Sequence, residues 1–175
     1  MAEPLRLQDL NLTAQRLTER DLQMYSYKYP RPMLTADCVV FGVRKDGGHA
    51  LLLVERGNDP FKGMWALPGG FMEMDETLEA CARRELEEET GCAVQGPMEE
   101  VGSFSAVDRD PRGRTVTVAF MTEVEETPVA GGDDARQARW FPLDQLPPLA
   151  FDHKEIVAAA LRRKFGTSQP PSGVQ

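Results

Sequence analysis

The sequence predicts an α/β fold in which helices cover both faces of a mixed β-sheet. Two β-rich runs, 34–43 and 50–55, flank the turn residues 45–48 and together have the pattern of a hairpin. A glutamate-rich run at 76–90 is compatible with a helix, and a second helix is signalled from Asp152 onward. Strands on both sides of the first helix, with another helix near the end of the chain, indicate a layered arrangement.

The length of the chain fits one domain with a proper core. Of its 175 residues, we expect 28–166 to form that domain. Residues 1–27 carry scattered leucines without a clean period, which predicts a short helix or an arm. Residues 167–175 have the composition of a disordered tail.

The segments around the first helix can be assigned from their strand and turn signals. Residues 57–66 are expected to form a loop, and Gly91 is expected to end the helix in a left-handed conformation. Two strands near 98–107 and 115–124 follow, joined by an arginine-bearing turn, and a short strand lies near 138–141.

The second helix has both a start and a stop signal. Asp152 with Glu155 three residues later forms a capping-box pattern, and Gly166 is expected to stop the helix. Four residues between them give an apolar stripe: Ile156, Val157, Ala160 and Leu161.

Composition and charge narrow the function classes. The net charge of −8 argues against nonspecific nucleic-acid binding, which relies on clustered Lys and Arg. No apolar stretch approaches the length of a membrane span, and no secretory leader opens the chain. Cys38, Cys81 and Cys92 show no pairing pattern, which fits a reducing cytoplasm. We therefore expect a cytoplasmic protein with a small-molecule partner.

Three glutamates in the run 76–90 are spaced so that a helix would gather them on one side. Glu85, Glu88 and Glu89 stand at i, i+3 and i+4, with neighbouring Cβ atoms roughly 5–6 Å apart. The same sector of the helix holds apolar residues: Leu78, Cys81, Ala82 and Leu86. Burying carboxylates without partners costs several kcal/mol each. The pattern therefore predicts a bound cation, and the alternative is a solvated acidic face.

The ligand types favour a hard divalent metal ion. An all-carboxylate cluster suits Mg²⁺ or Mn²⁺, which take oxygen ligands and keep waters and substrate phosphates in their coordination shell. Zinc is disfavoured because the chain has only two histidines and its cysteines lack zinc spacing.

The segment from Gly70 to Cys92 resembles the Nudix box. Eight positions match the pattern: Gly70, Glu76, Arg84, Glu85, Leu86, Glu88, Glu89 and Gly91. Cys92 departs from it, since an aliphatic residue is usual there, but cysteine behaves as a small buried hydrophobe. The resemblance implies a Nudix-type α/β/α sandwich with a mixed sheet, and a hydrolase acting on a phosphoanhydride.

The resemblance extends beyond the box, over roughly residues 28–165. The segments Tyr29–Pro32, Asp59–Trp65 and Pro147–His153 are similar to bacterial Nudix enzymes described as ADP-ribose pyrophosphatases. This similarity implies Mg²⁺- or Mn²⁺-dependent hydrolysis of ADP-ribose to AMP and ribose 5-phosphate by a homodimer. The first alternative is a MutT-like enzyme that removes oxidised nucleoside triphosphates. The second is a non-catalytic nucleotide-sugar sensor, which is disfavoured because the box is intact and few residues follow Trp140.

The resemblance also implies roles for individual residues. Gly70 would contribute a backbone carbonyl to the metal, beside the carboxylates of Glu85, Glu88 and Glu89. Arg84 would pair with these carboxylates and hold their geometry. The expected catalytic residues are Glu85, Glu89, Arg84 and Asp134. The general base stays open among Glu85, Asp133 and Asp134, with Asp134 as the choice for a late acid.

The substrate contacts are predicted from charge and aromatic character: Arg31, Arg56, Phe71, Arg109 and Arg112. The alternative for Arg109 and Arg112, and for nearby Arg114, is a solvated hairpin tip. Tyr29, Trp65, Phe71 and Phe104 could stack a base or belong to the core. His153 is expected to cap or pack at the start of its helix.

Overall fold

The computed structural model describes residues 26–132 and 135–167. The chain divides into two units, residues 1–31 and residues 32–175. In the first unit, the Arg31 guanidinium lies 3.9 Å from the centre of the Tyr27 ring. Almost all of the expected arm at 1–27 and tail at 167–175 fall outside the described residues.

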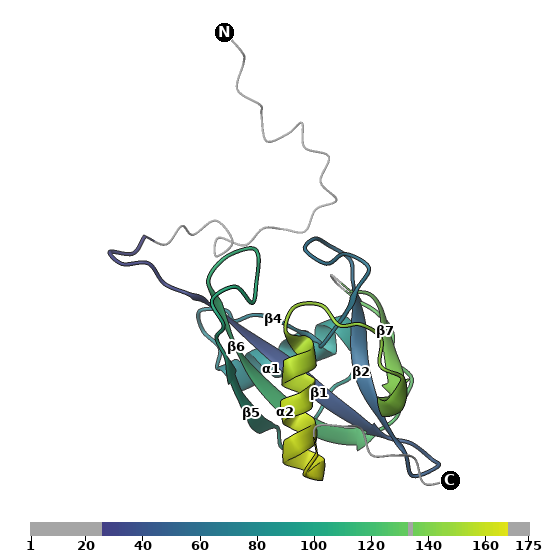
Figure 1. The fold of residues 1–175 in the computed structure, drawn as a ribbon. Coiled ribbons are helices and arrows are strands. Elements are labelled where there is room, and N and C mark those ends of the chain that lie inside the picture. Colours follow the sequence, from purple (N-terminus) through teal and green to yellow (C-terminus); the bar gives the residue numbers. More distant parts are fainter. Residues whose placement is uncertain (1–25, 133–134, 168–175) are drawn as a thin grey trace, which may run out of the picture. The chain divides into compact units, whose positions relative to one another are not determined.

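The second unit contains one mixed seven-stranded sheet (Figure 1). Its strands are β1 (Met33–Val43), β2 (His49–Arg56), β3 (Trp65–Ala66), β4 (Gly69–Phe71), β5 (Glu99–Phe104), β6 (Thr115–Glu125) and β7 (Ala135–Pro142). The main path runs β3-β2-β1-β6-β5, while β4 pairs with β1 and β7 pairs with β2. The β1–β6 pair is parallel, and the other pairs are antiparallel.

The two helices cover opposite faces of this sheet. In Figure 1, α2 (His153–Phe165) crosses in front of the strands and α1 (Leu78–Thr90) lies behind them. Alternate β1 side chains point to opposite faces, so Val39 joins the core under α2 and Cys38 joins the core under α1. A short 3-10 helix, Leu143–Gln145, follows β7. The predicted α/β fold with a mixed sheet covered on two faces is confirmed.

The ends of α1 are fixed by local interactions. The Ala80 N–H donates to Thr77 Oγ1 at 3.1 Å, which caps the first turn. Gly91 ends the helix with φ 69°, in the left-handed region where glycine is favoured. The predicted helix at 76–90 and its glycine stop are therefore confirmed, and the helix begins two residues later than expected.

The capping box predicted for α2 is wrong. Asp152 precedes the helix, but its side chain makes no capping hydrogen bond. Its carboxylate instead accepts two hydrogen bonds from Arg109, at 2.8 Å and 2.6 Å. The bidentate pair with a guanidinium joins two opposite charges through two hydrogen bonds, whereas a cap would bond the same carboxylate to uncharged backbone N–H groups. Gly166 ends the helix with φ 72°, as predicted.

The segment before α1 is more regular than the predicted loop at 57–66. Its last residues form β3, and β4 follows at Gly69–Phe71. Strand β4 pairs with β1 so that Gly70 lies opposite Ala36. The backbone of the expected metal-binding segment is thus attached to a central strand. In the described residues, no helix is long and apolar enough to cross a membrane.

Removal of the Leu86 side chain should loosen α1 from the sheet. Leu86 is fully buried in the core cluster under α1. Leu86→Ala should lower the free energy of unfolding by about 2–5 kcal/mol, since it removes buried methyl groups and leaves a cavity. Chemical denaturation measures the loss. Glu87→Ala, at an exposed position of the same helix, is the control and should change stability little.

Candidate active site

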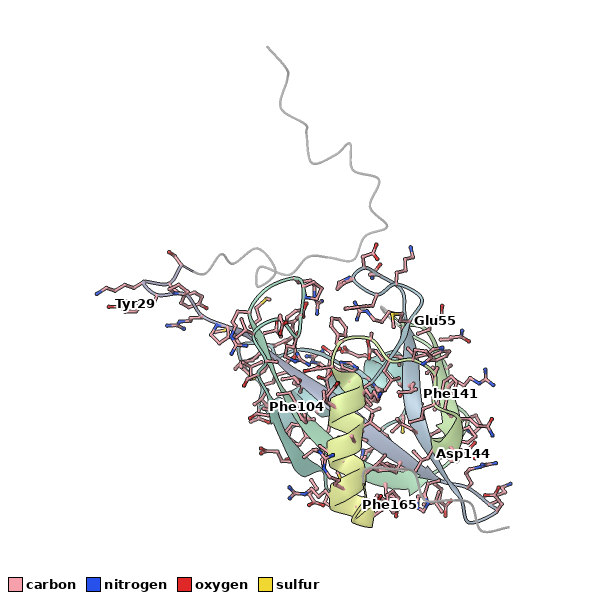
Figure 2. The ribbon with its side chains drawn as sticks, viewed as in Figure 1. Tyr29, Glu55, Phe104, Phe141, Asp144 and Phe165 are labelled. Carbon is pink, nitrogen blue, oxygen red and sulfur yellow. The ribbon has the colours of Figure 1, made fainter. Side chains whose placement is uncertain are left out.

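A cavity of about 420 Å³ opens where α2 begins, at one end of the sheet. Its walls come from β1, β2 and β4, from α1, from the turn at 109–112 and from the first residue of α2. Figure 2 shows Glu55, one of the lining residues, at the opposite end of the sheet from Phe165, where α2 ends. The cavity therefore collects side chains from segments that lie far apart in the sequence.

The motif glutamates differ in their surroundings. Glu89 accepts a hydrogen bond from the Gly69 N–H at 3.0 Å, and burial raises the pKa of its carboxyl to about 8. Burial also raises the pKa of Glu85, whose side chain is 16% exposed. The Glu88 side chain is 46% exposed. The expectation that all three acids face inward is therefore wrong for Glu88, which lies at the solvent edge of the helix.

Arg84 connects the carboxylates around the motif. Its Nη1 lies 2.7 Å from Glu85 Oε1 and 3.1 Å from Glu88 Oε2. Its Nε and Nη2 donate to the two oxygens of Glu76 at 3.0 Å and 2.7 Å. These hydrogen bonds lower the pKa of Glu76 to about 2 and raise the pKa of Arg84. The guanidinium thus offsets the repulsion among acids that are close in space.

Gly70 allows the Glu85 carboxylate to approach the β4 backbone closely. A Cβ atom at residue 70 would lie 2.4–2.6 Å from the carboxylate atoms of Glu85, which is closer than atoms can pack. The Glu85 carboxylate therefore packs directly against the backbone of Gly70. The thiol of Cys81 lies 3.7 Å from the Gly70 carbonyl oxygen, on the same side of the helix.

The donor set fits a hard divalent metal ion in its chemistry. Among the described residues, no three His, Cys, Asp or Glu side chains form a group that could hold a metal ion. The carboxylates have other partners instead. Arg84 donates hydrogen bonds to Glu85 and Glu88, and the Gly69 N–H donates to Glu89. The raised pKa values of Glu85 and Glu89 nevertheless show that their charge is poorly compensated. A cation held by oxygen ligands would supply that compensation.

Four of the five predicted substrate contacts line the cavity: Arg56, Phe71, Arg109 and Arg112. The Arg112 guanidinium lies 4.9 Å from the centre of the Phe71 ring and 5.6 Å from that of Phe151. Arg56 lies 4.8 Å from the Phe151 ring. Phe151 has φ 51°, a sparsely populated conformation for a residue with a side chain. Guanidinium groups and aromatic faces thus alternate along this wall.

The arginine-bearing turn is not simply a solvated hairpin tip. The Arg109 side chain is 4% exposed and is held by Asp152. Arg112 donates to both oxygens of Asp110, and these bonds lower the pKa of Asp110 although burial opposes the shift. Both cations therefore reach the cavity already paired with an aspartate.

The other candidates are distributed as follows. Trp65 and Phe104 pack against the core under α2, which favours the core interpretation for both. Arg31 lies in the first unit, so its substrate contact stays a prediction. Asp133 and Asp134 fall outside the described residues. The preceding Gly132 N–H donates to the Glu89 carbonyl at 3.2 Å, so this loop starts beside α1.

Sequence reasoning missed two polar residues of the cavity wall. Asp37 is a buried acid in the middle of the apolar strand β1, and that contrast was a signal that could have identified it. His153 was expected to cap or pack. Its Nδ1 accepts a hydrogen bond from the Leu67 N–H at 2.9 Å, and burial lowers its pKa. It therefore packs as expected, but it also lines the cavity.

Comparisons with known proteins agree with this geometry. A model of the family described as NUDIX domain matches residues 32–160. A protein from Methanocaldococcus jannaschii described as "ADP-ribose pyrophosphatase" is 41% identical over 150 residues, which make up 86% of this chain and 85% of that protein.

Two further similar proteins are linked to ADP-ribose by their descriptions. The "ADPR responsive transcriptional repressor NtrR" of Acinetobacter baylyi is 38% identical, and the match covers 77% of this chain and 55% of the repressor. The crystallised NUDIX domain of Shewanella oneidensis NrtR, complexed with ADP ribose, superimposes with a TM-score of 0.71 at 33% identity. That match covers 79% of this chain and 93% of the crystallised one.

Glu89→Gln should stabilise the metal-free protein near neutral pH. The pKa of Glu89 is raised from 4.5 to about 8, so the native state keeps a proton that the unfolded state has lost. This contribution to stability is fully present below pH 4.5 and is lost as pH rises through 8. An uncharged glutamine avoids the loss, which amounts to roughly 3–4 kcal/mol at about pH 7.5.

Thermal unfolding in EDTA at several pH values tests this expectation. The Tm of Glu89→Gln should exceed that of the wild type near neutral pH, and the difference should vanish in acid. Glu88→Gln is the control, because the half-exposed Glu88 side chain stays hydrated in the folded protein. This variant should not show the same gain in Tm near neutral pH. A Tm of Glu89→Gln that falls below the wild type at every pH would contradict the expectation.

Proposed function

Since the chain belongs to the NUDIX domain family, as a Nudix hydrolase, we propose that it hydrolyses ADP-ribose to AMP and ribose 5-phosphate. The observation that carries the proposal is the cavity itself. Acidic side chains of α1 form one wall, while arginines and aromatic rings form another. This combination suits a diphosphate linked to two organic groups, because each wall matches a different part of such a substrate.

Glu85, Glu88 and Glu89, with the backbone carbonyl of Gly70, would hold Mg²⁺ or Mn²⁺. When bound, the ion would neutralise phosphate charge and lower the pKa of an attacking water. Arg84 keeps Glu85 and Glu88 in place from its position between them. The Gly69 N–H holds the Glu89 carboxylate against the β4 backbone. The general base remains open among Glu85, Asp133 and Asp134, and Asp134 is our choice for a late acid.

The arginine and aromatic wall would bind the rest of the substrate. Phe71 is 40% exposed and would offer its ring to a base or sugar. Arg56 and Arg112 would attract the diphosphate, and their stacking on Phe151 limits their motion. Arg109 lies in the same wall, but its pairing with Asp152 suits a role in holding the wall together. Arg31 is kept as a possible further contact.

Two other functions remain as alternatives. A MutT-like enzyme would use the same metal ligands on nucleoside triphosphates. A sensor of nucleotide sugars is suggested by the similarity to ADPR-responsive repressors. The 41% identity to a protein described as ADP-ribose pyrophosphatase favours the diphosphatase. The homodimer, the cytoplasmic location and the absence of nucleic-acid binding stay predictions.

Glu89→Gln should also remove nearly all hydrolytic activity. Glutamine keeps an oxygen for the Gly69 N–H but lacks the charge that a divalent cation needs, so kcat/KM with Mg²⁺ should fall at least about 100-fold. Chromatography of AMP formed from ADP-ribose measures the change, with EDTA as the zero and Mn²⁺ as a second metal. Glu87→Gln, on the exposed side of α1, should keep its activity. Full turnover by Glu89→Gln would overturn the metal-site assignment.

ADP-ribose should be cleaved with a higher kcat/KM than any nucleoside triphosphate. The net charge is −8 and few Lys side chains are clustered in the sequence, which suits two phosphates neutralised by metal better than three. Comparison of ADP-ribose, dGTP and 8-oxo-dGTP in one buffer measures the preference. A tenfold advantage of the triphosphates, about 1.4 kcal/mol, would select the pool-cleaning alternative and leave the metal site intact.

A further inference from the structure

Asp37 and His153 form a polar pair in the cavity wall that the proposed hydrolysis does not use. Both residues line the cavity and both are buried. Asp37 Oδ2 accepts a hydrogen bond from the Thr117 hydroxyl at 2.6 Å. The other oxygen, Oδ1, lies 3.7 Å from His153 Nε2, which is too far for a direct hydrogen bond. His153 Nε2 and Asp37 Oδ1 therefore face each other without a hydrogen bond, and we call the place beside these two atoms the gap.

The chemical character of this gap follows from the hydrogen bond on the far side of the imidazole. His153 Nδ1 accepts from the backbone N–H of Leu67, so Nδ1 carries no proton. In the neutral ring the proton is then on Nε2, which acts as a donor. The neighbouring Asp37 Oδ1 is an acceptor. The wall therefore presents one donor and one acceptor side by side.

A hydroxyl group satisfies both atoms at once. It accepts a hydrogen bond from His153 Nε2–H and donates one to Asp37 Oδ1. A carbonyl oxygen can only accept, and an exocyclic amine can only donate, so each would leave one partner unmet. A phosphate oxygen would be repelled by the Asp37 carboxylate. Among the parts of a nucleoside diphosphate sugar, a ribose hydroxyl combines both functions in one atom, whereas the adenine edge needs its amine and a ring nitrogen side by side.

The position of the pair next to the motif agrees with a ribose. Gly69 lies between the pair and the catalytic carboxylates, since its N–H donates to Glu89 Oε2 at 3.0 Å. A Cβ atom at residue 69 would lie 2.7 Å from Asp37 Oδ1, so only glycine leaves the pair open on this side. A group bound by Asp37 and His153 is therefore close to the reacting diphosphate, where the sugars are attached.

We propose that Asp37 and His153 bind one ribose hydroxyl of the substrate and thereby select for an intact sugar. The proposal rests on the proposed function, because it assigns a part of that substrate to this wall. Thr117 orients the Asp37 carboxylate, and Leu67 fixes the imidazole. Neither group needs to take part in the chemical step.

The test is a calorimetric titration of the full chain in EDTA, so that no turnover occurs. The ligands are ADP-ribose and its five monodeoxy analogues, each lacking one of the five hydroxyls of the two riboses, the anomeric one included. The wild type should bind one analogue at least about tenfold more weakly than ADP-ribose, because its binding leaves a buried donor and acceptor unmet. kcat/KM ratios with Mg²⁺ give a second readout.

Two variants should remove this discrimination. His153→Asn keeps an acceptor for the Leu67 N–H but has no donor at the position of Nε2. Asp37→Asn keeps an acceptor for the Thr117 hydroxyl. It places the amide NH₂, a donor, at the position of the acceptor Oδ1. Each should bind ADP-ribose and the sensitive analogue within about twofold of each other. Asp144→Asn is the control, since Asp144 is exposed and does not line the cavity, and it should keep the wild-type ratio.

The outcomes are distinct. If all five analogues bind the wild type within about twofold of ADP-ribose, the pair binds no ribose hydroxyl of the substrate and the proposal is overturned. If the penalty persists undiminished in both variants, the hydroxyl is bound elsewhere and the proposal also fails. The comparison of analogues on the wild type tests the proposal even if the variants fold poorly. Failure of the proposed function would instead appear as no AMP formed with Mg²⁺.

Discussion

The candidate site depends on holding several carboxylates close together in a partly buried cavity. Carboxylates repel one another and lose hydration when buried, so a fold that collects them must supply positive charge or hydrogen-bond donors. Here Arg84 supplies charge to Glu76, Glu85 and Glu88, and the Gly69 N–H serves Glu89. The compensation is incomplete, as the raised pKa values of Glu85 and Glu89 indicate. The remaining deficit is what makes the site suited to a divalent cation.

The opposite wall of the cavity is held by a second charged pair. Arg109 and Asp152 join the turn at 109–112 to the start of α2, and the bond uses the carboxylate that would otherwise cap the helix. The start of α2 therefore lacks a side-chain cap, and the Asp152 carboxylate fixes the position of the turn at 109–112 instead. Arg112 in that turn stacks on Phe71 and Phe151, so the pair also positions the groups proposed to meet the substrate.

Sequence patterns were informative where the interactions are local. The helix that carries the glutamates, its left-handed stop at Gly91 and the continuously buried strand β1 all follow from neighbouring residues. Patterns failed where partners are distant. Arg109 meets Asp152 across 43 residues, and Leu67 meets His153 across 86. Helical spacing also overstated the burial of Glu88, because a three-residue offset does not show where the sheet ends beneath a helix.

The parallel pairing of β1 with β6 has a consequence for how the site comes into being. All eleven residues of Met33–Val43 pair with Thr115–Glu125, and Thr117 reaches Asp37 across 80 positions of the chain. Such nonlocal pairing is slow to form. On the ribosome, the segment proposed to bind the metal emerges well before the residues that complete the opposite wall. The nascent chain therefore carries the motif for some time without a cavity, and ligand binding belongs to the finished protein alone.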